Sequence, residues 1–188
     1  MALLRLLVLL SGMIAWACSG SSGDGQTNST PLSCGQTCQD DQVGYAIDST
    51  MWLLWNENIA GQASGSKNLT VTCPLGGSAQ VTGTTGMSSN GIDTIHLTFN
   101  LQDCANSGTY YSLAFSGTLT WDGTFSSSSA NALTFKSSAL TISGTVKLYD
   151  KPMLSETCSV SLTDTYNANV TSKSAWLIGE ICSRTVSQ

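Results

Sequence analysis

Hydrophobic residues recur at helical spacing in one segment beyond the N-terminal region, at residues 40–60. The apolar positions of this segment lie three to five residues apart, and they are Val43, Ile47, Met51, Leu54 and Ile59. Trp52 and Trp55 widen the apolar stripe. Asp40 or Asp41 is suited to cap the first turn, and Gly61 is suited to the left-handed conformation that often ends a helix. The segment therefore predicts one amphipathic helix.

Most of the chain after this helix alternates between apolar and polar residues, as half-buried β-strands do. The clearest run is 92–101, whose apolar positions are Ile95, Leu97, Phe99 and Leu101. Residues 111–121 repeat the pattern, and Asp122-Gly123 then indicates a turn. The apolar phase slips across residues 137–139, which predicts a bulge or a turn there. We expect about six to eight antiparallel strands joined as a meander.

A near-repeat at a spacing of 27 residues relates residues 113–123 to residues 140–150. Both copies contain Ser-Gly-Thr and place a glycine on the apolar side of a strand. Comparable mid-strand positions are occupied by four glycines: Gly83, Gly117, Gly144 and Gly179. Glycine weakens a strand unless the missing side chain leaves space that is needed. We interpret these glycines as the device that curves the sheet around the helix.

Together these elements predict a mainly β (α+β) fold, in which one helix packs on a strongly curved antiparallel meander sheet or half-barrel. The helix must bury its apolar stripe, and the inward face of the sheet is the partner that can cover it. A chain of 188 residues is long enough for one domain with a sizeable core. We place this single domain at residues 40–188.

The N-terminal segment has the three-part layout of a secretory signal. It combines Arg5, an apolar run too short to span a bilayer comfortably, and the sequence Ala15-Trp16-Ala17-Cys18. We expect residues 1–17 to be removed on export. Two cleavage patterns compete: Ala15-x-Ala17 suits ordinary signal peptidase, whereas Ala17-Cys18 is similar to a bacterial lipobox that has Ala15 and Trp16 at unusual positions.

The number of cysteines favours the lipobox. The chain has seven, and an odd cysteine in an exported protein needs an explanation. If Cys18 is lipidated, the other six can pair completely. More than one acyl chain would anchor the protein stably to a membrane, and residues 18–39 would be the lipidated cysteine and a flexible tether. Similarity to Gram-negative sorting signals then places the protein in the bacterial cell envelope, at the outer membrane, because Ser19 is not acidic. The alternative is a secreted or periplasmic protein.

Six cysteines remain for disulfides: Cys34, Cys38, Cys73, Cys104, Cys158 and Cys182. Strand order favours two bridges between neighbouring strands, Cys73–Cys104 and Cys158–Cys182, and leaves Cys34 and Cys38 to close a small loop before the helix. In a C-x3-C loop, each cysteine could instead reach the sheet. A redox or metal site at these two cysteines is disfavoured, because the spacing is not C-x-x-C and no second ligand pair is near.

Composition restricts the partners. Charged residues make up 10% of the chain and the formal net charge is −5, with no cluster of Lys and Arg. Nucleic acid is therefore not expected as a partner, because phosphate binding needs a basic footprint. Ser and Thr supply more than a quarter of the residues, which is typical of an exported β protein with hydroxyl-bearing sheet faces.

Several short motifs occur between residues 40 and 182: Cys73-Pro74-Leu75-Gly76-Gly77, Phe99–Cys104, Ser116-Gly117-Thr118, Ser143-Gly144-Thr145 and Gly179-Glu180-Ile181-Cys182. In these motifs the chain resembles uncharacterised exported lipoproteins of myxobacteria and related Gram-negative bacteria. The resemblance implies export and a lipid anchor. It implies no activity, cofactor or substrate.

No residue pattern predicts a catalytic or metal site. His96 is the single histidine, it lies among threonines, and no nucleophile-elbow motif accompanies it. The acidic residues Glu57, Asp93, Asp122, Asp150 and Asp164 are scattered and form no calcium-loop motif. We therefore expect a non-enzymatic protein without a cofactor.

Two binding roles are open. Trp52 and Trp55 either fill the core or line a cavity between the helix and a curved sheet, in which case the protein would carry a hydrophobic ligand. Alternatively, the polar sheet face contacts a partner or polysaccharide, which an exposed row of aromatic residues from Tyr110, Tyr149 and Trp176 would favour. We predict an envelope lipoprotein with a structural or binding role and keep the carrier as the alternative.

Overall fold

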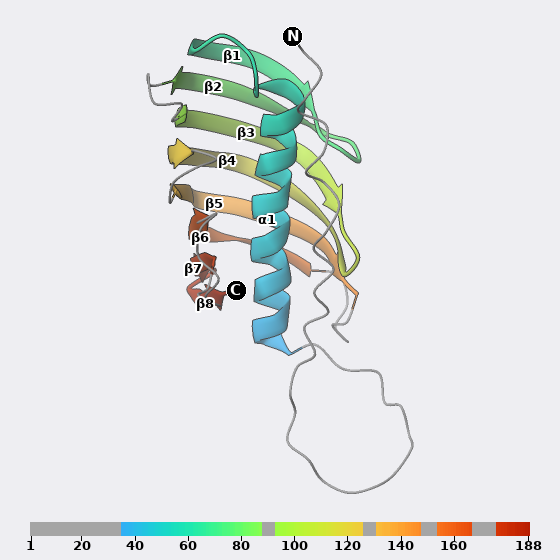
Figure 1. The fold of residues 1–188 in the computed structure, drawn as a ribbon. Helices are drawn as coiled ribbons and strands as arrows, with labels where there is room; N and C mark the ends of the chain where they lie inside the picture. Colours follow the sequence, from blue (N-terminus) through green and yellow to red (C-terminus); the bar gives the residue numbers. More distant parts are fainter. Residues whose placement is uncertain (1–34, 88–92, 126–130, 148–153, 167–175) are drawn as a thin grey trace, which may run out of the picture. The chain divides into compact units, whose positions relative to one another are not determined.

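The fold is seen in a computed structural model, which describes residues 35–87, 93–125, 131–147, 154–166 and 176–188. One helix, α1 (Gln36–Asn58), precedes eight strands. The strands are β1 (Gly65–Thr72), β2 (Ser78–Met87), β3 (Asp93–Ser107), β4 (Tyr111–Phe125), β5 (Asn131–Val146), β6 (Leu154–Tyr166), β7 (Leu177–Ile181) and β8 (Arg184–Ser187). Every strand pairs antiparallel with its neighbours in the sequence, and β1 and β8 are the edges (Figure 1). The predicted mainly β meander with one helix is confirmed.

Helix α1 begins four residues before the predicted start, at Gln36. Residues 36–39 are therefore helical, and the prediction that the tether extends to residue 39 is wrong. Neither predicted N-cap is at the start of the helix, because Gly35 precedes its first turn. Polar contacts within the helix stabilise this early turn: the Gln36 amide donates to the side chains of Gln39 and Asp40, at 2.8 and 2.9 Å. Because these contacts join polar side chains, they produce no apolar periodicity from which the start of the helix could be predicted.

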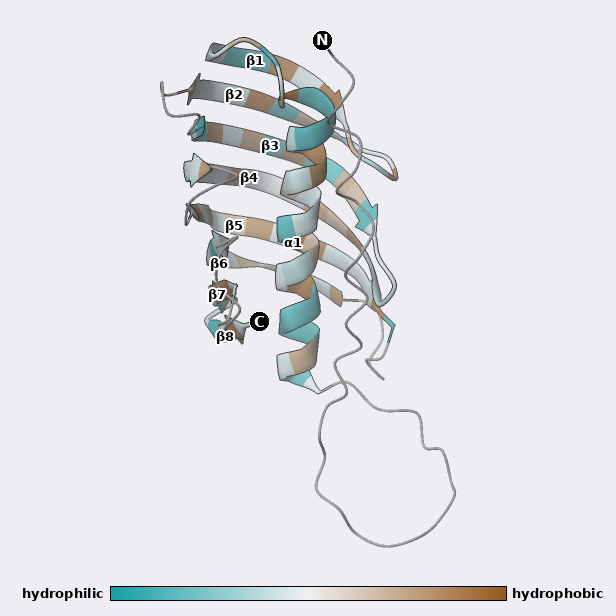
Figure 2. Cartoon of the chain, viewed as in Figure 1, coloured by the Kyte–Doolittle hydropathy of each residue, from teal (hydrophilic) through white to brown (hydrophobic). Residues whose placement is uncertain are grey.

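The sheet has two different faces, which we call the inner face, toward α1, and the outer face, opposite it. Residues of high and low hydropathy are interspersed along the strands (Figure 2), and buried positions alternate with more exposed ones in much of β3 and β4. The cross-strand register aligns buried residues of four adjacent strands in one row on the inner face: Leu97, Trp121, Phe135 and Leu162. This row lies beneath α1 and forms the centre of the core.

Trp121 is the central side chain of that core and is 0% exposed. Its ring lies edge-on to Trp52 and Trp55 of α1, with centroid distances of 5.2 and 5.7 Å. Phe135 stacks on it at 5.6 Å. The two helix tryptophans therefore pack on the middle of the sheet, which favours core filling over cavity lining for both.

Two strand boundaries differ from the sequence prediction. The predicted turn at Asp122-Gly123 is wrong, because both residues lie within β4 and pair with residues 95 and 96 of β3. The sequence predicted a final strand at residues 175–182, which corresponds to β7, but β8 was missed: the chain turns at Cys182 and Ser183 and returns as β8. The predicted irregularity at residues 137–139 is confirmed, since the register of β5 and β6 shifts between Ser137 and Leu140.

The mid-strand glycines permit strands to approach one another. Gly144 has a φ of 128°, and a Cβ at this position would collide with the Ser112 carbonyl oxygen of β4. Gly83 has the same φ and would collide with the His96 carbonyl oxygen of β3. Any L-residue would be strained at both positions. The close approach is thus between strands, and the proposed role in sheet curvature stays a prediction.

Two disulfides join parts of the sheet. Cys73, after β1, is bonded to Cys104 of β3, with a Cα–Cα distance of 5.3 Å. Cys158 of β6 is bonded to Cys182, after β7, at 5.0 Å. These are the two pairings that strand order favoured. Cys34 lies outside the described residues, as do Cys18 and the signal segment, so the expectations for them stay predictions.

Candidate functional site

A pair of acidic side chains is buried between α1 and the sheet. Asp48 of α1 is 6% exposed and Asp164 of β6 is 5% exposed. The indole Nε1 of Trp52 donates to Asp164 Oδ2 at 3.2 Å. Trp52 lies four residues after Asp48, so both side chains are on the same side of the helix. We call Asp48 and Asp164 the carboxyl pair.

Burial makes ionisation of this pair unfavourable. The pKa of Asp48 is raised well above its ordinary value of 3.8, first by burial and then by the charge of Asp164, while a hydrogen bond from Trp52 opposes the shift. Burial likewise raises the pKa of Asp164, again against the Trp52 hydrogen bond. Asp48 Oδ1 has no hydrogen-bond partner among the described residues. The arrangement therefore favours a state in which at least one carboxyl keeps its proton.

A separate polar network links α1 to β3 and β4. The side-chain amide of Asn106 donates to Thr50 Oγ1 at 3.1 Å and to the Tyr111 hydroxyl at 3.4 Å. Thr50 donates to the Ala46 carbonyl oxygen at 2.6 Å. Burial raises the pKa of Tyr111, and a hydrogen bond with Ser49 opposes the shift. The helix–sheet interface thus contains a polar layer beside its aromatic core.

A cluster of ion-paired side chains joins the N-terminal half of α1 to the sheet. Arg184 of β8 donates from Nε to both carboxylate oxygens of Asp40 at 3.0 Å, and from Nη2 to Glu156 Oε1 of β6 at 2.6 Å. The Asp40 side chain is only 3% exposed. Without Arg184, the buried Asp40 carboxylate would lose its cationic partner, so these three residues join the helix to β6 and β8.

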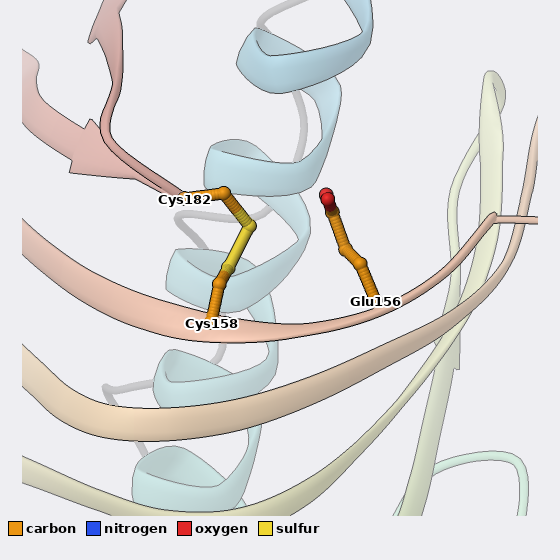
Figure 3. Close-up of side chains that lie close together, drawn as sticks. All are labelled: Glu156, Cys158 and Cys182. Carbon is orange, nitrogen blue, oxygen red and sulfur yellow. A yellow bond between two sulfur atoms is a disulfide. The ribbon is translucent and has the colours of Figure 1, made fainter.

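Glu156 also lies close to the Cys158–Cys182 disulfide, as Figure 3 shows. One ligand atom from each of these three residues lies within 4.8 Å of the others. The metal ligand that cysteine supplies is the thiolate, however, and here both sulfurs are bonded to each other. Glu156 is held by Arg184. The cluster is therefore a disulfide beside an ion pair.

The other predicted candidates are apart from the carboxyl pair. His96 lies on the outer face with its side chain 65% exposed, and its Nδ1 is 3.1 Å from Asp122 Oδ1 on the neighbouring strand. Trp176 packs edge-on against Tyr45 of α1 at 6.0 Å, and Tyr110 lies between β3 and β4. Tyr149 is outside the described residues. The structure shows no aromatic row on the described part of the outer face.

Sequence reasoning missed Asp48 altogether and treated Asp164 as one of several scattered acids. A signal was present for both. Asp48 immediately follows Ile47 within the apolar stripe of the helix, and it precedes Trp52 by four residues. Asp164 continues the inward phase of Val160 and Leu162 in β6. An acid at an inward position of each of two packed elements predicts a buried polar contact.

Hydroxyl and amide groups cover the outer face. The register aligns one row across six strands, Asn68, Thr82, Thr98, Thr120, Lys136 and Ser161. An adjacent row contains Ser66, Thr84, His96, Asp122, Thr134 and Thr163. No described helix or strand packs on this face. The outer face is thus a broad polar surface of low charge.

The sequence motifs of the proposed lipoprotein resemblance fall at ends and middles of strands. Residues 73–77 form the connection between β1 and β2, and the two Ser-Gly-Thr motifs lie within β4 and β5. In the described part of the chain, no helix combines the length and hydrophobicity that crossing a bilayer requires. No protein-family model, curated protein or solved structure matches the chain, so the resemblance stays a prediction.

Proposed function

We propose that the chain is a non-enzymatic lipoprotein of the bacterial cell envelope, anchored at the outer membrane through Cys18, that binds a partner with its outer face. The disulfides indicate an oxidising compartment outside the cytoplasm. The secretory layout of residues 1–17 and the odd cysteine count support export and lipidation. The anchor would hold the domain at a surface and leave the sheet to make contacts.

The observation that carries the binding role is the outer face itself. Its two central rows are mostly hydroxyl and amide side chains, and they run across strands about 4.8 Å apart. Each hydrogen bond contributes only about 1 kcal/mol, so a useful partner must engage many groups at once. An extended neutral polysaccharide offers such repeated hydroxyls. The low charge of the face also suits a neutral polymer better than a phosphate-rich one.

A carrier of a hydrophobic ligand is the alternative. It requires the strong sheet curvature and a cavity lined by Trp52 and Trp55. The edge-on packing of both rings against Trp121 weighs against this role, because both side chains already contact the core. The surface-binding role needs no such space inside the domain.

Retention of the soluble domain on insoluble neutral polysaccharides, such as cellulose, chitin and mannan, tests the proposal. We expect binding to at least one of them, and we expect Thr98→Lys with Thr120→Lys to weaken it at least about tenfold by placing two cations in adjacent strands. Glu57→Lys is the matched control, because it changes the net charge equally at an exposed site on α1. Equal retention of all three proteins, or no retention on any polymer, would count against the outer face as the binding surface.

A further inference from the structure

The carboxyl pair joins two elements that are far apart in the sequence. Asp48 comes from the middle of α1, and Asp164 comes from β6, where it pairs with Leu177 of β7 and Leu133 of β5. Both of these cross-strand neighbours of Asp164 are apolar, and its hydrogen bond comes from Trp52 of α1. Whatever joins these two carboxyls therefore joins the helix to the sheet.

The environment of the two carboxyls suits a proton better than a metal ion. The Trp52 N–H points at Asp164, and a hydrogen that carries positive partial charge repels a cation from the same space. Asp48 Oδ1 is buried without a partner among the described residues, so it can accept or donate one additional hydrogen bond. A protonated carboxyl removes one of two like charges from a poorly solvated site.

We propose that one proton retained by the buried pair of Asp48 and Asp164 latches α1 onto β6, and that loss of this proton to solvent loosens the helix from the inner face of the sheet. The O–H bond of one carboxyl breaks, the proton passes to water, and two carboxylates remain buried in the interface between α1 and the sheet. The chain would then hold its helix most firmly under acidic conditions. This latch is independent of what the outer face binds.

The direction of the pH effect follows from the raised pKa values. The folded protein binds a proton that the unfolded chain has already released above pH 3.8, so this stabilisation is complete below that pH and is lost as the pH rises through the folded-state pKa. Within that window, loss of one such proton raises the unfolding equilibrium constant by up to about tenfold for each unit by which the pH increases.

Other titratable groups near the pair are accounted for. Tyr111 of β4 lies near Asp48, and Tyr45 of α1 packs against Tyr111; neither brings a positive charge. No Lys, Arg or His is among the groups that shift either carboxyl in the described part of the chain. Asp41, near the start of α1, also has a pKa raised by burial. Its contribution is present in every variant, so the differences between variants isolate the carboxyl pair.

Denaturant unfolding of Asp48→Asn, Asp164→Asn and wild type between pH 4 and pH 8 tests the latch. Each asparagine keeps one donor between the side chains, so both variants are expected to fold. We expect the unfolding equilibrium constant of each variant to rise with pH less steeply than that of the wild type, by up to about tenfold per pH unit. Glu57→Gln, an exposed carboxyl on the same helix, is the control and should keep the wild-type slope.

The indole N–H resonance of Trp52, assigned through Trp52→Phe, gives a second readout in the unsubstituted protein. It should shift with pH at the same midpoint as the stability change, and that midpoint should move to lower pH in Asp48→Asn, which removes the neighbouring like charge from Asp164. A merely structural pair would leave this resonance independent of pH. Wild-type slopes in both asparagine variants, or a Trp52 resonance that does not titrate above pH 3.8, would overturn the proposal.

Discussion

Replacing Trp121 with alanine is expected to lower the free energy of unfolding by about 3–5 kcal/mol, measured by urea denaturation. The side chain is completely buried and contacts aromatic rings from α1 and from neighbouring strands. Removing it would leave a large cavity where the helix meets the centre of the sheet. Domains of this size are typically stable by only about 5–15 kcal/mol, so the loss would be a large part of the total.

Trp121→Phe is the matched control. Its ring keeps most of the stacking on Phe135, and the indole Nε1 that it removes has no hydrogen-bond partner among the described residues. We expect a loss roughly half as large or smaller, because no hydrogen bond is broken. Equal losses for alanine and phenylalanine would show that Trp121 is not the centre of the core packing.

Removing the Cys73–Cys104 disulfide by replacing both residues with alanine is expected to cost about 3–4 kcal/mol. The bond closes a loop with a sequence separation of 31 residues, and opening that loop increases the entropy of the unfolded chain. The double substitution leaves no free thiol to form other pairs. The unfolding midpoint in urea would fall, with a similar result for Cys158 and Cys182, whose sequence separation is 24.

Wild-type protein unfolded with and without a reductant gives the control for these variants. Reduction should destabilise the unsubstituted protein by more than it destabilises either alanine pair. A Cys73→Ala, Cys104→Ala protein as stable as wild type would contradict the stabilising role of this disulfide. The closed loop is what distinguishes the unfolded wild-type chain from the unfolded variant chain.

Much of the fold followed from local patterns. Alternation predicted the antiparallel strands, because residues that face a covering helix must be apolar and those that face away need not be. The phase slip near Ser137 predicted the register shift for the same reason: one extra residue reverses which side chains face inward. Strand order then favoured the two observed disulfides, because neighbouring antiparallel strands bring distant cysteines together.

The missed features depend on tertiary contacts. Three of residues 36–39 are polar, and hydrogen bonds from Gln36, which no apolar spacing reveals, stabilise their helical conformation. Asp122-Gly123 has the composition of a turn, but pairing with strands on both sides keeps it in β4. Asp48 and Asp164 were overlooked for a related reason. An isolated acid in a sequence is ordinarily solvent-exposed, and only the packing of α1 on β6 brings these two together.

The central claim is that this domain is displayed in the cell envelope from a lipid anchor at Cys18. The most direct test is the intact mass of the mature protein, extracted in mild detergent from the envelope of a Gram-negative host and followed by fragmentation of its N-terminus. We expect a chain that begins at Cys18 and carries a diacylglyceryl group and an N-acyl chain, with the other six cysteines oxidised. A mature chain with an unmodified Cys18, or one that begins elsewhere, would contradict it.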